Sequence, residues 1–420
     1  MKEPIRVGII GLGGFAGAHH RAIKNLESRG EARLICTCDP AAAHFDAPRQ
    51  EFHLAERGVQ VFDDYRKMLE TCGGQLDLII VPTPIPLHEE MHRAGVERGI
   101  AVYLEKPPTL DYLELERMIS CDRLARHATL VGFNFIIEPP RLALKKRLLA
   151  GEFGALQETR MLGRWPRPTS YFERNGWAGR LHGNDGRVIL DSVLGNAMAH
   201  YVHNMLFWAG GPELMSWAAL DTVQATLHRA YRIEGPDTFF VQARTHSGIA
   251  MRYALTHTRT PVSAHSETVV CADATLDYQV GSGGQIRWND GRIEPIAPER
   301  FETLEANHLA YFSYLRGETD RPATRLVDSR PFVMLNNLAF VSSEAIHTFP
   351  TERIGTYRDE REQKDYLEVA GLTAAQDAFL ATGAWPNELG SPADGPAAVS
   401  AADLDRFHRT VKALAKPESP

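Results

Sequence analysis

The sequence predicts an α/β protein with a doubly wound parallel sheet in its first part and an open, largely antiparallel sheet in its second. In residues 1–134, short apolar runs alternate with amphipathic helical stretches, which is the pattern of a parallel sheet covered by helices. From about residue 215 to 287 the pattern changes to strands separated by Gly, Ser, Asn and Asp, which indicates antiparallel pairing.

The first region, residues 1–134, contains six expected strands. They cover residues 5–10, 33–38, 59–62, 76–81, 100–104 and 129–133. Helical stretches separate them, including one that follows the first strand to about Ser28 and another over residues 111–127. The order of elements therefore predicts a sheet of parallel strands joined by helical crossovers.

The second region, residues 135–350, is predicted to be an α+β domain. Helices are expected at residues 140–150, 192–208, 299–315 and 329–347, and strands at 238–241, 249–254, 267–270 and 275–280. Residues 351–420 form a C-terminal extension. We expect it to be partly loose, because residues 383–402 are rich in Gly, Pro and Ala and precede a short terminal helix.

Composition excludes several classes of protein. The chain of 420 residues has a formal net charge of -7, which argues against nucleic-acid and membrane partners. Five scattered cysteines do not make a disulfide framework, and no run of 18 apolar residues predicts a membrane span. No signal sequence is evident before the first strand, so the expected location is cytoplasmic.

A glycine-rich loop follows the first strand and opens a helix. It reads Gly11-Leu12-Gly13-Gly14-Phe15-Ala16, a Gly-x-Gly-x-x-Ala fingerprint in a strand–loop–helix context. Gly11 permits a tight turn, Gly13 lets the backbone approach a pyrophosphate, and Ala16 is small enough for close packing of helix on strand. We therefore expect the N–H groups of this loop, including those of Gly14 and Phe15, to bind a dinucleotide.

An acidic residue ends the second strand. Asp39 lies about 20 residues past the loop, where a carboxylate accepts hydrogen bonds from both ribose hydroxyls. A 2′-phosphate at that place would meet charge repulsion, so the sequence favours NAD over NADP as cofactor.

Three further segments make the pattern specific. They are Val81-Pro82-Thr83-Pro84 with His88, Tyr103-Leu104-Glu105-Lys106-Pro107-Pro108, and Val131-Gly132-Phe133-Asn134. With the glycine loop, they resemble the glucose–fructose oxidoreductase / inositol dehydrogenase / MocA (Gfo/Idh/MocA) family over about residues 5–350. The resemblance implies a Rossmann domain, a second α/β domain that mediates homo-oligomerisation, to a dimer or tetramer, and a sugar, cyclitol or related polyol as substrate.

The resemblance also assigns roles to residues. It places Thr83, Pro84, His88, Glu105 and Asn134 on the cofactor side. It places Lys106 between the nicotinamide ribose and the reacting hydroxyl. An ammonium there can donate to the oxygen whose charge changes as hydride moves.

A helix of the second region carries the other family signature. The family has an Asp and a His four residues apart, and here Asn196 and His200 occupy those positions. Asn cannot take a proton, whereas neutral imidazole suits a general base. Asp191 has two possible roles, as the missing carboxylate of the site or as a helix cap with Ser192. His203 lies on the same helix face and is a weaker substrate-binding candidate.

The segment before this helix resembles the substrate-side loop of sugar-acting relatives. Aromatic rings stack on sugar C–H groups, while Arg and Asn donate to hydroxyls or a carboxylate. The candidates are Tyr171, Asn175, Trp177 and Arg180, and packing of the aromatic rings within the loop is the alternative explanation.

One further motif matches a different chemistry. His88-Glu89-Glu90-Met91-His92 fits HExxH, the pattern of zinc proteases. No third ligand is evident downstream, and a zinc hydrolase leaves the glycine loop and Glu-Lys-Pro unexplained. We therefore predict no metal site.

Together these features predict an NAD-dependent oxidoreductase of carbohydrate metabolism that transfers a hydride between nicotinamide and a hydroxyl carbon. Two alternatives stay open. One is an enzyme that retains NAD and oxidises a sugar transiently, so that the keto intermediate allows cleavage of a glycosidic substituent. The other is a regulator that senses nucleotide and sugar without catalysis.

Overall fold

The chain forms two compact units. The computed structural model describes residues 3–183, 185–260, 264–392 and 395–415. The N-terminal unit takes the chain up to Thr109 and adds Leu113–Glu138 and Phe301–Ser329. The C-terminal unit comprises Leu110–Tyr112, Pro139–Arg300 and the chain from Arg330 onward. Each unit is built around one main sheet.

The N-terminal unit contains the predicted parallel sheet. All its strand pairs are parallel, in the order β3-β2-β1-β4-β5-β6. The strands are β1 (Ile5–Ile10), β2 (Ala32–Cys38), β3 (Gln60–Phe62), β4 (Leu78–Val81), β5 (Ala101–Leu104) and β6 (Leu130–Val131). The order reverses between β1 and β4, and ligands of such sheets bind at the carboxyl ends of the strands beside that point.

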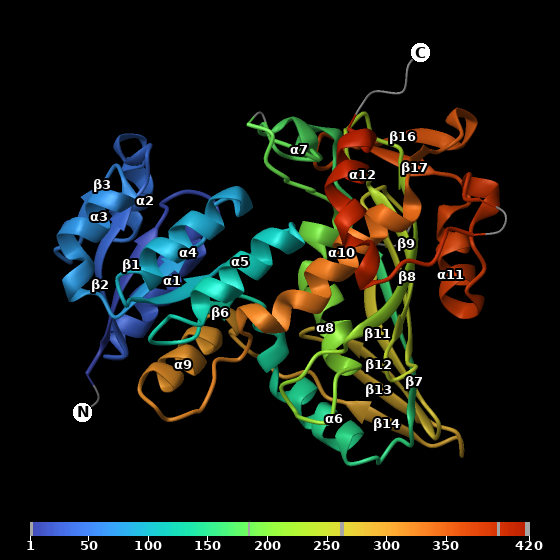
Figure 1. Cartoon of the computed structure of the whole chain (residues 1–420), viewed down its shortest axis with the longest axis horizontal. Coiled ribbons are helices and arrows are strands. Elements are labelled where there is room, and N and C mark those ends of the chain that lie inside the picture. The colour runs from blue at the N-terminus through green and yellow to red at the C-terminus, as the bar shows by residue number, and fades with distance from the viewer. Residues whose placement is uncertain (1–2, 184, 261–263, 393–394, 416–420) are drawn as a thin grey trace. The chain divides into compact units, whose positions relative to one another are not determined.

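Helices join the strands of this sheet and cover it (Figure 1). They are α1 (Ala16–Ser28), α2 (Asp46–Glu51), α3 (Tyr65–Cys72), α4 (His88–Val96), α5 (Tyr112–Asp122) and α9 (Thr303–Leu315). Five short 3₁₀ turns lie between them among the described residues: η1 (Ala42–His44), η2 (Gly73–Gln75), η3 (Ile85–Leu87), η4 (Asn134–Ile137) and η6 (Leu326–Ser329).

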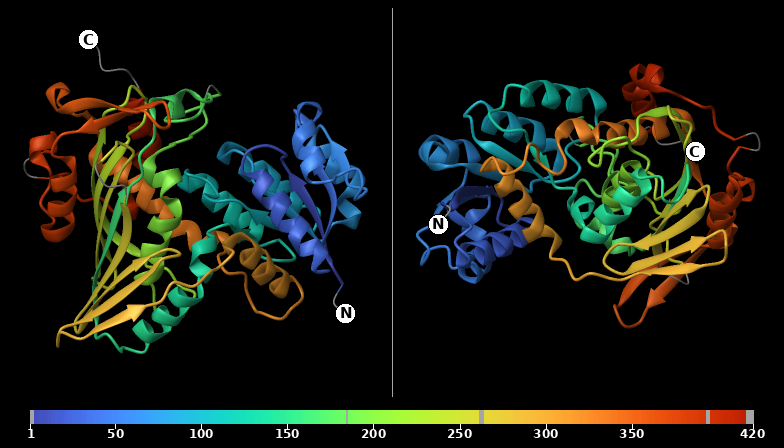
Figure 2. Two further views of the ribbon diagram at one scale, coloured as in Figure 1. Left: turned by 180° about the vertical axis from the view of Figure 1, so that it is seen from behind. Right: turned by 90° about the horizontal axis from the view of Figure 1, so that it is seen from below.

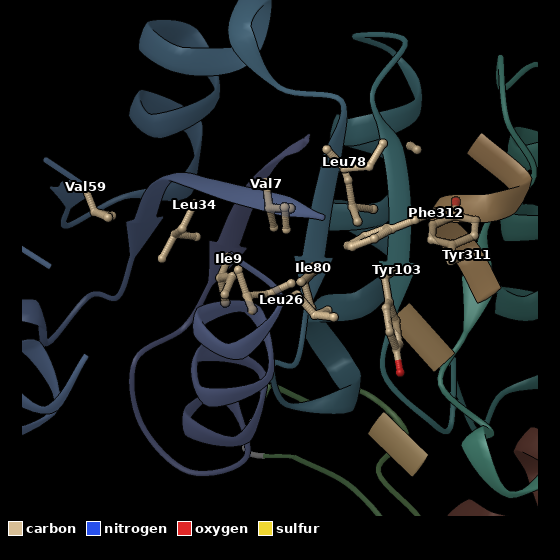
Figure 3. Packing of buried hydrophobic residues seen from close by; sticks show 14 of the residues in the cluster. Val7, Ile9, Leu26, Leu34, Val59, Leu78, Ile80, Tyr103, Tyr311 and Phe312 are labelled. Carbon is tan, nitrogen blue, oxygen red and sulfur yellow. The ribbon is translucent and has the colours of Figure 1, made fainter. Parts of the chain in front are cut away.

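Apolar side chains of the sheet and of two helices form the core of this unit. Alternate residues of β1 and β4 point to one face, where they meet Leu26 of α1 (Figure 3). Tyr311 and Phe312 of α9 complete the cluster, and both are fully buried. A helix about 300 residues along the chain therefore belongs to the unit that begins at the N-terminus, although it falls in the stretch predicted as the second region.

The C-terminal unit is built on the expected open sheet, with nine strands in the order β14-β13-β12-β11-β7-β10-β9-β8-β15. Pairing is antiparallel except between β10 and β7 and between β15 and β8. The strands are β7 (Leu156–Arg164), β8 (Leu220–Arg229), β9 (Thr238–Thr245), β10 (Ala250–Thr256), β11 (Ala264–Cys271), β12 (Ala274–Gln279), β13 (Gly283–Trp288), β14 (Ile293–Ile296) and β15 (Ile346–Thr348). The predicted fold class is confirmed in both units.

Helices lie on both faces of this sheet. Figures 1 and 2 show α8 (Ala199–Trp208) and α10 (Arg330–Ser343) on one face and α11 (Leu372–Thr382) on the other. The remaining elements are α6 (Pro139–Leu149), α7 (Thr169–Glu173), α12 (Phe407–Leu414), the hairpin β16 (Ile354–Asp359) and β17 (Lys364–Val369), the π-helical turn η5 (Val193–Ala197), and the 3₁₀ turns η7 (Thr351–Arg353), η8 (Asn387–Leu389) and η9 (Ala401–Arg406). None of the described helices combines the length and apolar character that a membrane span requires.

The C-terminal extension packs against the outer face of the nine-stranded sheet. Phe379 of α11 and Leu389 are fully buried in a cluster with Phe240 of β9 and Ala254 of β10. Polar contacts reinforce this packing, because the Arg164 guanidinium donates to the Gln376 side chain and to Asp377. The C-terminal extension therefore covers part of one face of the nine-stranded sheet.

Buried histidines make the stability of this unit depend on pH. His228 of β8 is fully buried, and its Nε2 lies 3.2 Å from the Thr226 hydroxyl and 3.1 Å from the Ser391 hydroxyl. Burial, followed by the neighbouring His347, lowers the pKa of His228 to about 3. Below pH 6.5 the unfolded chain therefore binds a proton at this site that the folded chain excludes.

We predict that acidification from pH 6.5 towards pH 4 lowers the free energy of unfolding, by about 1.4 kcal/mol per pH unit for this histidine. His228→Gln removes the titrating group, and the slope should become shallower by that amount. Urea unfolding of both proteins across this range measures it. The exposed His44, changed to Gln, is the control, and equal slopes for wild type and His228→Gln would contradict the prediction.

Candidate functional site

The glycine loop lies between β1 and α1 and has the backbone that close approach of a ligand requires. Gly11 and Gly14 adopt φ angles of 132° and 57°, which disfavour any side chain. A Cβ on Gly13 would lie 2.8 Å from the Phe45 ring. The Cβ of Ala16 would be 3.1 Å from a Cβ at Gly11, so a larger residue would push helix and strand apart. Phe15 is exposed at the helix start.

Asp39 holds the loop from the end of β2. Its Oδ2 accepts a hydrogen bond of 3.0 Å from the Leu12 N–H, and its Oδ1 accepts one of 2.9 Å from the Ala41 N–H. The carboxylate is half-buried, and each oxygen has a second lone pair. The acid predicted to bind ribose is therefore fixed beside the phosphate loop.

The loops after β4 and β5 are tied together by His88. Its imidazole is fully buried, with Nε2 2.8 Å from the Thr83 carbonyl oxygen and Nδ1 3.1 Å from those of Pro107 and Pro108. Burial lowers the pKa of His88, so the neutral ring donates one N–H to this set of carbonyls. The loop with the candidate cofactor residues Thr83 and Pro84 is thereby joined to the Glu-Lys-Pro turn, whose Lys106–Pro107 bond is cis.

Glu105 anchors that turn through a buried chain of hydrogen bonds. Its Oε2 accepts from the Lys106 N–H, and its Oε1 lies 3.1 Å from Nε2 of His19 in α1. Nδ1 of His19 lies 3.1 Å from Nε2 of His308 in α9. Burial lowers the pKa of His308 well below its usual value, so its ring is neutral in this hydrogen-bonded pair with His19.

Neither His19 nor His308 was selected as a functional residue from the sequence. His19 follows the glycine loop, and its place on the inner face of α1 was the available signal. His308 is 289 residues away from its partner, and nothing in the sequence relates the two positions.

Asn134 is the last cofactor candidate of this unit. It is 6% exposed, and within the described part of the chain its Oδ1 is buried without a hydrogen-bond partner. An orphaned buried carbonyl, a bare glycine loop and a fixed carboxylate together fit a dinucleotide. Lys106 belongs to the same unit and is half-buried.

In the C-terminal unit, the helix expected at residues 192–208 is divided. The π-helical turn η5 precedes α8, and the Ser192 hydroxyl caps it by accepting from the Gly195 N–H at 2.9 Å. A π-helical turn frequently occurs at functional sites. It places Asn196 at the end of the turn and the half-buried His200 in the first turn of α8.

Asp191 does not cap the turn, because the Ser192 hydroxyl does so. Its Oδ1 accepts a 2.8 Å hydrogen bond from the Asn196 amide, and its Oδ2 accepts one of 2.8 Å from the Gly179 N–H. Burial raises the pKa of Asp191 against the opposing effect of these two donors. The Asp191 carboxylate is therefore hydrogen-bonded to the amide of Asn196, which occupies the position of the family aspartate.

The other predicted residues lie in the preceding loop or in the interior. Asn175 accepts from the N–H groups of Trp177 and Ala178, which closes the loop. Arg180 is exposed, and its carbonyl accepts from the Asp191 N–H. His203 is fully buried, and its Nδ1 accepts a 3.3 Å hydrogen bond from Trp217.

The aromatic ring of Tyr171 contacts two arginine side chains of this loop. The guanidinium of Arg174 lies 3.9 Å from its ring centroid and that of Arg167 lies 4.4 Å away. Arg174 also lies 4.9 Å from the centroid of a Trp177 ring. Sequence reasoning did not select these two arginines, although both fall within the segment that it assigned to substrate.

The histidines of the HExxH match serve the fold. His88 makes the carbonyl contacts described above, and His92 Nε2 lies 3.1 Å from the Thr129 hydroxyl and 3.4 Å from Asp122. In the part of the chain that the structure describes, no group of three His, Cys, Asp or Glu side chains could hold a metal ion.

Comparison with known proteins identifies relatives of the N-terminal unit. Residues 5–133 match the family GFO_IDH_MocA, described as an oxidoreductase family with an NAD-binding Rossmann fold. Inositol 2-dehydrogenase 4 of Saccharopolyspora erythraea is 33% identical over 159 residues, which are 36% of this chain and 43% of that protein. Inositol 2-dehydrogenase of Rhizobium meliloti is 24% identical over 177 residues, 41% of this chain and 49% of that protein. These matches span less than half of each curated relative.

Solved structures share the fold over a longer part of the chain. The WlbA dehydrogenase from Bordetella pertussis, in complex with NADH and UDP-GlcNAcA, has a TM-score of 0.66 at 23% identity and covers 81% of this chain and 97% of its own. Levoglucosan dehydrogenase in complex with NADH has a TM-score of 0.68 at 14% identity, with the same two coverages.

The hydrogen bond from His19 to Glu105 predicts unequal effects at two adjacent histidines. His19→Leu leaves Oε1 of the buried Glu105 carboxylate without this donor and should cost about 2–4 kcal/mol of unfolding free energy. His20 is equally buried, but its Nε2 donates to the Gly11 carbonyl, so His20→Leu should cost about 1 kcal/mol beyond packing. Urea denaturation of both variants measures how much unfolding free energy each one loses. Equal losses would contradict the larger contribution predicted for the bond to Glu105.

Proposed function

Because residues 5–133 belong to the Gfo/Idh/MocA family of NAD-binding oxidoreductases, we propose that this chain is an NAD-dependent dehydrogenase of a sugar, cyclitol or sugar derivative. The observation that carries the proposal is the Glu-Lys-Pro turn at the carboxyl end of β5, which Glu105 and His88 hold from both sides. A lysine on such a fixed turn suits an electrophilic role towards a reacting oxygen.

The proposed cofactor is NAD. Bound there, its nicotinamide would accept or return the hydride. The N–H groups of the loop from Gly11 to Ala16 would bind its pyrophosphate, and Asp39 would accept from its adenosine ribose. Asn134 would find a partner for its buried Oδ1.

Side chains of the protein would stabilise the charge on the substrate oxygen and take the proton of its hydroxyl. The Lys106 ammonium would donate to the substrate oxygen and stabilise negative charge on it. His200 would take the hydroxyl proton at its imidazole. Asn196, held by Asp191 at 2.8 Å, would position the substrate or the imidazole without taking a proton itself.

The names of the relatives support the substrate class. Curated relatives include inositol dehydrogenases and a dTDP-sugar 3-reductase, and proteins of the same fold include levoglucosan dehydrogenase and a dehydrogenase crystallised with UDP-GlcNAcA. All of these names describe a sugar or a cyclitol. Tyr171 and Trp177 supply aromatic faces of the kind on which sugar rings stack.

We expect Lys106→Met to lower kcat for NAD reduction by roughly 10²- to 10⁴-fold, because the donor to the reacting oxygen is lost. A panel of inositols and sugars, followed by absorbance of reduced nicotinamide, measures it. NAD affinity should change little, and Lys146→Met, at an exposed lysine of α6, is the control. A wild-type protein that binds NAD but reduces it with no polyol would instead favour a regulator.

Asp39→Asn tests the choice of cofactor. The amide keeps an acceptor for the Leu12 N–H but removes the negative charge that repels a 2′-phosphate. We expect the ratio of NAD to NADP affinity to fall by about tenfold or more, which corresponds to roughly 1.4 kcal/mol. Fluorescence titration measures both affinities. Asp46→Asn, at an exposed site nearby in the sequence, should leave the ratio unchanged, and an unchanged ratio in Asp39→Asn would contradict the assignment.

A further inference from the structure

The loop that carries Tyr171 holds two positive charges on one aromatic ring. Arg167 precedes α7 and Arg174 follows it, and both guanidinium groups lie over the Tyr171 ring, at 4.4 and 3.9 Å from its centroid. The Arg174 guanidinium also lies 4.9 Å from the centroid of a Trp177 ring. Stacking fixes the plane of each guanidinium but leaves its N–H groups available in that plane.

Neither arginine has an anionic partner within the described residues. Other arginines of this unit form ion pairs, such as Arg160 with Glu158 at 2.6 Å, but Arg167 and Arg174 form none within 4.0 Å. The Nε–H of Arg167 is moreover buried without an acceptor among these residues. A buried donor left unsatisfied is costly, and an anionic ligand that accepts from the Arg167 Nε–H would remove that cost.

The position of Arg167 is set by its backbone. The Arg167 N–H donates to the His257 carbonyl at 2.9 Å, and the Arg167 carbonyl accepts from the Tyr231 hydroxyl at 2.5 Å. Both partners are at least nine-tenths buried. The guanidinium therefore projects from a rigid part of the loop, which is what a preformed binding group requires.

Asp191 is the carboxylate that these arginines influence, and it does not neutralise them. Its two oxygens accept from Asn196 and from the Gly179 N–H, while both arginines act on it only through space. Asp191 is therefore hydrogen-bonded to other groups, and it forms no ion pair with either guanidinium. The same carboxylate links this region to Asn196, four residues before His200.

From this arrangement we infer that the substrate carries an acidic group, a carboxylate or a phosphate, that Arg167 and Arg174 bind. The inference rests on the proposed function, because it takes the Tyr171 loop to be the sugar site of that reaction. It narrows the substrate class from sugars and cyclitols in general to sugar acids and sugar phosphates. Guanidinium groups bind both kinds of oxyanion in a bidentate manner.

The test compares three ligands that differ in charge. Isothermal titration calorimetry of the full chain saturated with NAD measures the affinity for glucuronate, glucose 6-phosphate and glucose. At least one of the two acids should bind roughly 10-fold or more tightly than glucose, and this preference should weaken as ionic strength rises. The better acid identifies the group that the arginines recognise.

Substitutions assign the effect to residues. Arg167→Gln and Arg174→Gln keep hydrogen-bonding capacity but remove the charge, and each should weaken binding of the preferred acid roughly 10- to 100-fold with little change for glucose. Arg292 stacks on Trp288 at 4.2 Å in the β13–β14 turn, so Arg292→Gln is a matched control for loss of a stacked arginine. Circular dichroism and thermal melts identify variants that fail to fold.

The outcomes separate this inference from the proposed function. Equal or weaker binding of both acids than of glucose, or acid binding unaffected by both substitutions and by salt, would overturn the inference. If the protein then oxidised a neutral polyol, the proposed dehydrogenase function would still be supported. Conversely, acid binding that depends on both arginines, with no NAD reduction by any sugar, would keep the anion site and overturn the dehydrogenase.

Discussion

One buried carboxylate, that of Glu105, joins the parts of the N-terminal unit on which its chemistry would depend. It receives the Lys106 N–H from its own turn and a hydrogen bond from His19 in α1, which in turn contacts His308 in α9. A Cβ at Gly132 would lie 2.6 Å from its Oε1, so the end of β6 has to be bare at that point. Because a carboxyl group in the interior must have its hydrogen-bond partners in place, these segments are constrained together and the lysine turn is held rigidly.

Two more polar side chains fix loops at the carboxyl ends of the strands in the parallel sheet. Asp39 fixes the glycine loop through the Leu12 N–H, and His88 joins the Thr83 loop to the Glu-Lys-Pro turn. Each loop is thus tied by a side chain to a strand, a helix or another loop. Preorganisation of this kind lowers the conformational entropy lost when a dinucleotide binds.

The C-terminal unit carries the residues proposed for acid–base chemistry and for binding an acidic substrate. Asp191 holds Asn196 on one side and the Gly179 backbone on the other, so the loop with Tyr171 and the turn before His200 share one support. The positive charges of Arg167 and Arg174 lie on that same loop. Its sheet is closed on the outer face by α11, whose Phe379 fills a hydrophobic cluster that the composition of the tail did not suggest.

The sequence by itself determined the features that depend on local patterns. Alternating strands and helices predicted the parallel sheet, and the glycine spacing with Asp39 predicted the nucleotide loop, because backbone geometry and short-range packing leave few other arrangements. Only the tertiary structure decided which distant residues meet. It brought α9 and His308 to the first unit and gave the cap to Ser192 rather than Asp191. Among the described residues it placed no carboxylate within ion-pair distance of Arg167 or Arg174. Such contacts depend on how the chain folds back on itself, and no periodicity encodes them.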